Sequence, residues 1–348
     1  MKLGIIGLPG SGRSTIFDAL TGARGEDGAQ KVTRADQRIS TVTVVDERVA
    51  FLEEIFKPKK TTYAQVEYLL PSGTTAGSSH KSDNAIWNQV RVCDALIHVL
   101  RNFQTPGGLP ATPVDDFWNL EENLIVDDLA VTEKRLERIE GDQKKGKKPD
   151  EDDYAAIRAC REQLEKGRPL RALPELTASP TLRGYTLLSA KPQLLISNND
   201  DEDESMPDWQ HRPEGLEIMV VRGRLERDIA GMSPEEAAEF LEAYHIDRSA
   251  LDRVIRCSYR LLDLISFFTV LNEEVRAWTV PAGSRAIEAA GTVHTDMQRG
   301  FIRAEVLSFE HLKEYGSVPE AKKAGHVSLE GKDYLVQDAD IINFRFNI

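Results

Sequence analysis

Cysteine is scarce in this chain, whose 348 residues contain only Cys93, Cys160 and Cys257. The three are odd in number and form no C-x-x-C pair, so we expect reduced, packed cysteines rather than a disulfide framework. Long apolar runs are missing too, and none approaches the roughly 20 residues that a membrane-spanning helix needs. No charged and then apolar leader precedes the first predicted strand. These absences predict a cytoplasmic protein with no membrane segment.

An excess of basic residues is also missing, because the formal net charge is -13 and the pI is about 5.2. This balance argues against a globally basic nucleic-acid binder or a peripheral membrane protein, although local basic surfaces remain compatible with it. The seven histidines are dispersed, with no H-x-x-x-H and no His/Cys spacing suited to zinc. No G-x-S-x-G occurs either, so the sequence offers no support for a hydrolase triad.

Glycine, in contrast, is concentrated where it is informative, in the run Gly7-Leu8-Pro9-Gly10-Ser11-Gly12-Arg13-Ser14-Thr15. This is the G-x-x-x-x-G-K-S pattern of a phosphate-binding loop, with arginine in place of lysine. An apolar run at 3–6 precedes it and a helical pattern follows it, which is the expected strand–loop–helix context. A glycine turn with no ligand is the plainer alternative.

Such a loop points backbone N–H groups inward, and the following helix adds its partial positive charge, so a polyphosphate is stabilised there. The predicted nucleotide-binding residues of the loop are Leu8, Pro9, Gly10, Ser11, Gly12, Arg13, Ser14 and Thr15. The hydroxyl of Ser14 is the predicted ligand of a Mg²⁺ ion on the phosphates.

Apolar segments alternate with helical patterns over most of the chain, which predicts an α/β fold with a parallel sheet covered by helices. The candidate strands are 2–6, 40–45, 65–70, 95–100, 193–197 and 217–221. Two long polar helices, at 118–140 and 152–166, interrupt this alternation. The lysine-rich link 144–149 joins them, so we expect an antiparallel helical hairpin with a basic tip. That tip is either a solvated turn or a contact for RNA or a partner.

The last part of the chain has a different texture. Ser233-Pro234-Glu235-Glu236 predicts a helix start with a capping box, and a further helix is expected at 249–262. From residue 265 short β-rich segments predict a small mixed α+β domain, and its candidate strands are 267–270, 275–280, 301–306, 333–336 and 341–346. Trp278 and Phe301 in this domain are core residues or, less simply, base-stacking platforms.

Several long runs resemble one known family. They include Val45-Asp46-Glu47-Arg48, Lys57-Pro58-Lys59-Lys60, Glu133-Lys134-Arg135-Leu136-Glu137-Arg138, Glu274-Val275-Arg276-Ala277-Trp278-Thr279-Val280, Gly300-Phe301-Ile302-Arg303-Ala304-Glu305-Val306 and Val336-Gln337-Asp338. Through them nearly the whole chain resembles the YchF/Obg-like ATPases, P-loop NTPases of the translation-factor class, and the similarity is strongest in their C-terminal TGS domain.

The resemblance implies a P-loop nucleotide-binding domain at 1–116 and 172–264, an inserted helical hairpin at 117–171 and a TGS-like domain at 265–348. It further implies a purine nucleotide, ATP or GTP, as ligand, Mg²⁺ as cofactor, and the ribosome or RNA as a partner of the hairpin and the TGS-like domain. The expected function is that of a nucleotide-binding, ribosome-associated protein.

The chain departs from the family at the nucleotide site. Arg13 replaces the loop lysine, and a planar guanidinium grips phosphate oxygens differently from a compact ammonium. Where the D-x-x-G motif is expected, Leu70 occupies the position of the magnesium-supporting aspartate and Gly73 that of the glycine. Leucine offers no oxygen to a hard cation. The switch threonine has no counterpart, since Arg34 falls there with Thr33 beside it.

The base-reading motif N-x-x-E corresponds to Asn198-Asn199-Asp200-Asp201, so Asn198 is the candidate for the purine's N7 edge and Asp201 for guanine's N–H groups. Gly223, between Arg222 and Arg224, lies where the family closes over the base. These residues leave ATP and GTP both open. His80 falls near the position of a family histidine, and a surface histidine is the simpler interpretation.

No catalytic residue is identified, and the departures predict weak or absent hydrolysis because a metal clamp and a loop cation act on the transition state. The alternative function is a non-enzymatic scaffold, a degenerate NTPase that contacts protein or RNA. A small-molecule kinase is disfavoured, because such enzymes carry arginine-rich acceptor and lid segments that are not seen here.

Overall fold

A computed structural model of the chain describes residues 1–22, 31–32, 37–72, 86–105, 107–108, 110–177, 179–213, 215–243, 249–271 and 273–347. Internal contacts divide the chain into two compact units. The first comprises residues 1–42 and 67–254, and the second comprises residues 43–66 and 255–348. The first unit therefore contains the glycine-rich loop and the helical hairpin.

The sheet of the first unit has the strand order β2-β3-β5-β1-β6-β7-β8. Its strands are β1 (Lys2–Ile6), β2 (Lys31–Val32), β3 (Arg38–Thr43), β5 (Gln65–Leu70), β6 (Ala95–Asn102), β7 (Gln193–Asn199) and β8 (Glu217–Val221). Pairing is parallel from β5 through β1, β6 and β7 to β8, whereas β2 and β3 are antiparallel. The predicted parallel sheet is confirmed, and its carboxyl ends meet at one edge.

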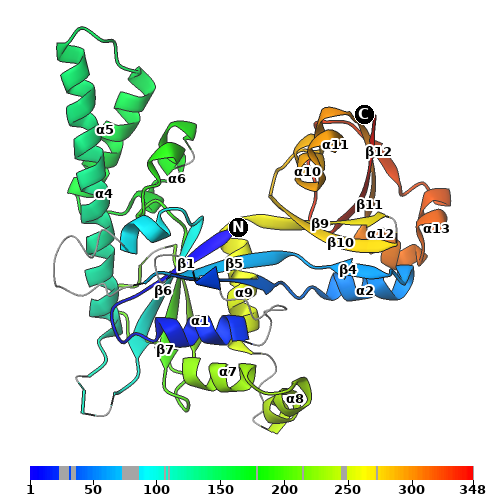
Figure 1. Ribbon diagram of the computed structural model, residues 1–348, viewed down its shortest axis with the longest axis horizontal. Helices are drawn as coiled ribbons and strands as arrows, with labels where there is room; N and C mark the ends of the chain where they lie inside the picture. The colour runs from blue at the N-terminus through cyan, green and yellow to red at the C-terminus, as the bar shows by residue number, and fades with distance from the viewer. Residues whose placement is uncertain are drawn as a thin grey trace. The chain divides into compact units, whose positions relative to one another are not determined.

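Helices cover this sheet, as Figure 1 shows. They are α1 (Arg13–Gly22), α4 (Pro113–Lys144), α5 (Glu151–Glu165), α6 (Pro174–Thr177), α7 (Gly223–Ala230) and α8 (Pro234–Ala243), with 3-10 turns η1 (Leu170–Ala172) and η2 (Pro180–Tyr185) and a helical segment at 86–90. Helix α9 (Ala250–Leu261) contains the point in the sequence, between Val254 and Ile255, at which the chain passes from the first unit to the second. The capping box before α8 is confirmed, since Ser233 and Glu236 exchange hydrogen bonds.

The hairpin of α4 and α5 is confirmed, and the two helices lie side by side in Figure 1. Helix α4 is fixed to the rest of the unit by Asp128, which is fully buried. Its carboxylate accepts hydrogen bonds from the backbone N–H groups of Leu188 at 2.9 Å and Ser189 at 2.7 Å. These bonds connect the hairpin to the chain that leads into β7.

A buried polar cluster also lies beneath α4. His98 of β6 is fully buried and stacks on Phe117, with ring centroids 5.7 Å apart. The Gln193 side-chain amide nitrogen lies 3.2 Å from His98 Nδ1. Glu121 and Arg171 form a buried ion pair at 2.5 Å. Burial and then the positive charge of Arg171 lower the pKa of His98 to about 3.

The second unit is built on a mixed sheet with the order β12-β11-β13-β9-β10-β4. Its strands are β4 (Lys60–Thr62), β9 (Leu264–Leu271), β10 (Glu274–Pro281), β11 (Phe301–Ser308), β12 (Ser328–Glu330) and β13 (Asp340–Phe346), and its helices are α2 (Glu47–Phe56), α10 (Ala286–Val293), α11 (Thr295–Arg299), α12 (Phe309–Tyr315) and α13 (Val318–Lys323). The strand expected at 333–336 is wrong. That segment makes a single bridge, between Leu335 and Arg285, because the strand that pairs with β11 lies earlier, at β12.

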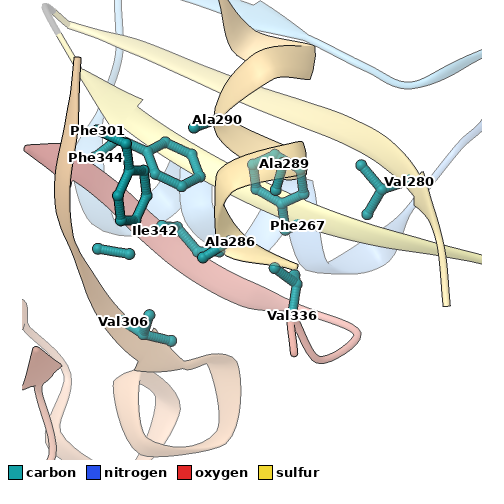
Figure 2. Packing of buried hydrophobic residues seen from close by; sticks show 11 residues of the cluster. Phe267, Val280, Ala286, Ala289, Ala290, Phe301, Val306, Val336, Ile342 and Phe344 are labelled. Carbon is teal, nitrogen blue, oxygen red and sulfur yellow. The ribbon is translucent and has the colours of Figure 1, made fainter. Parts of the chain in front are cut away.

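Neighbouring strand residues of this sheet belong to two different cores, as the two-residue period of a strand requires. Phe267 and Ile342 pack with α10 in one core, which Figure 2 shows. Phe268 and Ile341, the residues beside them in sequence, pack in the other core with α2 and α12. Phe301 belongs to the first core, and Trp278 packs against it, as the simpler interpretation predicted.

Residues 43–66 belong to the second unit although they lie between two strands of the first sheet in sequence. Strand β4 pairs in parallel with β10, and Val49 and Leu52 of α2 are fully buried in the core. Arg48 pairs with Asp46 at 2.7 Å and with Asp338 at 2.6 Å. Two runs that resemble the family, 45–48 and 336–338, are therefore brought together by this ion-pair network.

Candidate functional site

The glycine-rich loop connects β1, which ends at Ile6, to α1, which begins at Arg13. Gly7, Gly10 and Gly12 all have positive φ, at 154°, 77° and 92°, a conformation that side chains disfavour. The Ser11 N–H donates to the Leu8 carbonyl at 3.1 Å, which closes the turn. The loop therefore has the backbone of a strand-to-helix turn that only glycine adopts easily at these positions.

Asn198 is the residue that fixes this loop in place. It lies near the end of β7, is 4% exposed, and donates from Nδ2 to the Ser11 carbonyl at 3.0 Å. Its Oδ1 accepts from the Gly223 N–H, also at 3.0 Å. A Cβ on Gly12 would lie 2.1 Å from Nδ2, and one on Gly223 would lie 2.6 Å from Oδ1. Both glycines are thus needed for the approach of Asn198.

These contacts bring Asn198 and Gly223, 25 positions apart in sequence, together with the loop. Both amide atoms of Asn198 already have a protein partner, so its observed contacts are with the backbone of the site. Its predicted contact with a purine edge stays a prediction.

Asp201 follows β7, and its side chain contacts the first turn of α7. Its Oδ1 accepts from the Leu225 N–H at 3.2 Å, and its Oδ2 lies 3.8 Å from Nε of Arg224. The Arg222 guanidinium pairs with Glu204 at 3.0 Å and donates to the backbone carbonyl of Asp201 at 3.5 Å. The Asp201 side chain is 42% exposed, so part of its carboxylate is accessible to solvent.

The side chains of the loop differ in burial. Ser14 is exposed at the first turn of α1, whereas burial of the Arg13 guanidinium lowers its pKa, although an arginine stays charged at neutral pH. Ser11 is 2% exposed, and its hydroxyl has no hydrogen-bond partner among the described residues. A buried hydroxyl without a partner is costly, and a ligand oxygen in the loop would satisfy it.

Two residues that the sequence did not single out lie against the loop or against the helix that follows it. The ring of Phe103, directly after β6, would be 3.8 Å from a Cβ on Gly12. Its only sequence signal is an aromatic residue at the carboxyl end of a strand. Arg38 of β3 forms an ion pair with Asp18 of α1, and its guanidinium lies 4.6 Å above the Phe17 ring. Nothing in the sequence pairs residues 18 and 38.

The residues at the end of β5 do not fit a magnesium ion. Leu70, which follows the Leu69–Gly4 pair, is the last residue of the strand and is 7% exposed. Among the described residues no group of three or more His, Cys, Asp or Glu side chains is placed to hold a metal. Thr33, Arg34, Gly73 and His80 lie outside the described residues.

Comparisons with known proteins show the family to which this chain belongs. The family model YchF-GTPase_C, described as a protein of unknown function (DUF933), matches residues 264–347. The protein named ribosome-binding ATPase YchF in Bacillus subtilis is 35% identical, and the alignment covers 100% of both chains. Its counterpart in Escherichia coli O157:H7 is 36% identical over 100% of this chain and 99% of the relative. This chain belongs to the YchF family.

Solved structures agree with the YchF assignment. The structure titled as the Schizosaccharomyces pombe YchF GTPase superposes with a TM-score of 0.85 at 25% identity, covering 99% of this chain and 97% of that one. A GTP binding protein from Pyrococcus horikoshii gives a TM-score of 0.61 at 18% identity over 100% of both chains, which shows a shared fold. The predicted family resemblance is therefore confirmed. In the described part of this YchF chain, no helix combines the length and apolar character needed to cross a bilayer.

Proposed function

We propose that this YchF-family chain binds a purine nucleotide, ATP or GTP, with the phosphates in the 7–15 loop. The observation that carries the proposal is the bridge made by Asn198 between the Ser11 carbonyl and the Gly223 N–H. It holds a glycine turn at the carboxyl edge of a parallel sheet, where such folds bind their ligands. The helix α1 begins directly after the turn and adds a favourable field for phosphate.

We assign different parts of the nucleotide to different residues of the site. In this proposal the phosphates are bound by backbone N–H groups of the loop other than those of Pro9, which has none, and Ser11, which donates to the Leu8 carbonyl. The Arg13 guanidinium pairs with the phosphate oxygens. Phe103 provides an aromatic surface for the base beside Gly12. Asp201, with its exposed side, is the acceptor for base N–H groups, and Gly223 leaves room for Asn198. The sequence names Ser14 as a magnesium ligand, and that assignment stays a prediction.

Hydrolysis by this site is weak or absent in our proposal. The apolar end of β5 removes the carboxylate that would support charge in the transition state, and a change at the loop cation acts in the same direction. Each loss of about 1.4 kcal/mol of transition-state stabilisation slows the reaction tenfold. The bound state, held by backbone amides, depends less on these groups.

The ribosome is the proposed large partner, and the cytoplasm is the proposed location of the protein. This rests on the names of the relatives, ribosome-binding ATPase YchF, over the full length of the chain. The contact surfaces we propose are the TGS-like C-terminal domain and the hairpin tip, where Lys144, Lys145 and Lys148 lie beside the Lys147–Asp142 pair. The division into a nucleotide-binding domain, a hairpin and a TGS-like domain is part of the same proposal.

Titration of the purified full chain with fluorescent ATP and GTP analogues tests the nucleotide proposal. We expect saturable binding of at least one of them, and loss of affinity by about tenfold or more in Asn198→Ala. Glu133→Ala, an exposed change on α4, is the matched control and retains affinity. Binding of neither nucleotide at millimolar concentration would leave the scaffold alternative. Sedimentation with ribosomes, with and without nucleotide, then tests the partner.

A further inference from the structure

The strand β5 ends at an apolar residue, Leu70, where a nucleotide site that uses a divalent cation would need a carboxylate. We propose that this site binds its nucleotide without Mg²⁺, the phosphate charge being neutralised by the Arg13 guanidinium and the loop amides. The inference rests on the proposed nucleotide binding and deepens it, because it defines which form of the nucleotide is recognised. The proposed ligand is the nucleotide whose phosphates carry no bound metal ion.

The register of β5 against β1 puts an apolar group where a carboxylate would be needed. Leu69 is opposite Gly4, so Leu70 is level with the last residues of β1, directly before the loop. Leu70 is buried, and Ser72, two residues on, donates its N–H to the Gln89 side chain at 3.0 Å. The described residues of this strand end therefore present no carboxylate toward the phosphates.

Three carboxylates on the neighbouring elements that the structure describes are already engaged. Asp18 of α1 pairs with Arg38. Asp201 accepts from the N-terminal turn of α7, and Asp200 accepts from the Gln104 N–H at 3.3 Å. What remains in the loop is the hydroxyl of Ser14. A lone neutral oxygen does not replace the carboxylate through which Mg²⁺ is usually bound in octahedral geometry.

The loop has its own means of stabilising negative charge. Arg13 is charged at all relevant pH values and presents several N–H donors in one plane, which suits two phosphate oxygens at once. The unpartnered, buried Ser11 hydroxyl adds a donor aimed within the loop. The start of α1 contributes its partial positive charge. None of these groups requires a cation to act.

The decisive experiment measures nucleotide affinity of the full chain in excess MgCl2 and in excess EDTA. We expect binding to be tighter in EDTA than in MgCl2, because excess Mg²⁺ complexes the phosphates that the site recognises in their metal-free form. Affinity weaker by about tenfold or more in EDTA would overturn the inference while leaving nucleotide binding intact. Absence of binding in both buffers would overturn the proposed function and this inference together. Mn²⁺ EPR gives a second readout, since the nucleotide-loaded protein is expected to bind no more Mn²⁺ than the free nucleotide does.

Two variants locate the effect. Leu70→Asp supplies the missing carboxylate and is expected to make affinity at least about tenfold tighter in Mg²⁺ than in EDTA, whereas Leu70→Asn, of similar size without charge, retains the wild-type ratio. Arg13→Gln is expected to weaken binding in EDTA by about tenfold or more. Unchanged affinity in Arg13→Gln would overturn the role given to the guanidinium. If Leu70→Asp does not fold by circular dichroism, the wild-type comparison and Arg13→Gln still decide the question.

Discussion

Asn198 shows how much of this site depends on single residues. It bonds to the loop on one side and to Gly223 on the other, and glycines stand at both places where its amide approaches the backbone. The amide is 4% exposed, so a lost partner leaves a buried polar group unsatisfied. Substitutions of the loop glycines therefore distinguish the loss of the Asn198 contact from the cost of backbone strain.

Gly12→Ala is expected to damage the site more than Gly10→Ala. Both glycines have positive φ, 92° and 77°, so alanine costs about 1 kcal/mol in backbone strain at either position. Only at Gly12 does the new Cβ clash, 2.1 Å from Asn198 Nδ2, while nothing lies within 4 Å at Gly10. Urea unfolding is expected to show an additional loss of about 1–3 kcal/mol for Gly12→Ala. Equal losses in the two variants would show that the Asn198 bond contributes nothing.

His98 predicts a specific response to acid. Its pKa of about 3 in the folded protein lies below the unfolded value of about 6.5, so the neutral ring contributes stability that is fully present above pH 6.5. That contribution is lost as the pH falls toward 3, and about 1.4 kcal/mol is gone at pH 5.5. Urea unfolding at pH 7.5 and 5.5 measures it.

His98→Gln is expected to remove this part of the pH dependence, whatever its effect on stability at pH 7.5. His294→Gln, at a histidine whose side chain is 61% exposed, is the matched control and keeps the wild-type difference between the two pH values. A His98→Gln protein that loses as much stability on acidification as the wild type would refute the assignment.

At the scale of elements, the helical hairpin illustrates how a polar helix is attached to a sheet. The residues of α4 that face the core are mostly apolar, but Asp128 is buried among them and satisfies two backbone N–H groups. Burial raises the pKa of this carboxyl, while the Leu188 and Ser189 donors oppose the shift. The attachment is therefore a hydrogen-bonded contact that an apolar substitution cannot replace.

Asp128→Ala is expected to lower the free energy of unfolding by about 2–4 kcal/mol, because it leaves the two N–H groups buried without acceptors. Glu133→Ala on the exposed side of the same helix changes helix composition equally and is expected to stay within about 0.5 kcal/mol of the wild type. Chemical denaturation of the two variants checks the difference. A loss in Asp128→Ala no larger than in the control would rule out an anchoring role.

At the scale of the whole molecule, the C-terminal unit is not continuous in sequence. Strand β4 and helix α2, from residues 43–66, pair with β10 and fill one of its two cores. The sequence predicts instead a TGS-like domain of residues 265–348 alone. The structure groups residues differently because Val49, Leu52 and Ala64 cover the face of the sheet that carries Phe268 and Val275.

A fragment of residues 255–348 is accordingly expected to lack cooperative unfolding, because one face of its sheet loses the part of its apolar cover that Val49, Leu52 and Ala64 provide. Linking residues 43–66 to this fragment through a flexible connection is expected to restore a cooperative transition by circular dichroism. Arg48→Ala in the linked protein is expected to weaken it, since Asp46 and Asp338 lose their common partner. A cooperative transition in the short fragment would contradict the dependence on residues 43–66.

Local patterns were sufficient for the elements whose signals lie within a few residues. Strands at 2–6, 65–70 and 217–221 were predicted with their observed bounds, because alternation and apolar runs are short-range properties. The hairpin, the capping box and the loop of residues 7–12 followed for the same reason. The strands β4 and β12, three residues each, were missed, because so short a segment is extended only when a neighbouring strand pairs with it.

The sequence alone determined that a glycine-rich turn lies between a buried strand and a helix, that leucine stands at position 70 where the family has a carboxylate, and that the chain is similar to the YchF proteins. Only the tertiary structure decided that Asn198 bonds the loop, that Phe103 lies beside it, that Arg38 pairs with Asp18 of α1, and that residues 43–66 complete the second unit. The reason is physical. Turn conformation and periodicity are encoded by neighbours in sequence, whereas hydrogen bonds and cores join residues that the chain brings together only when it is folded.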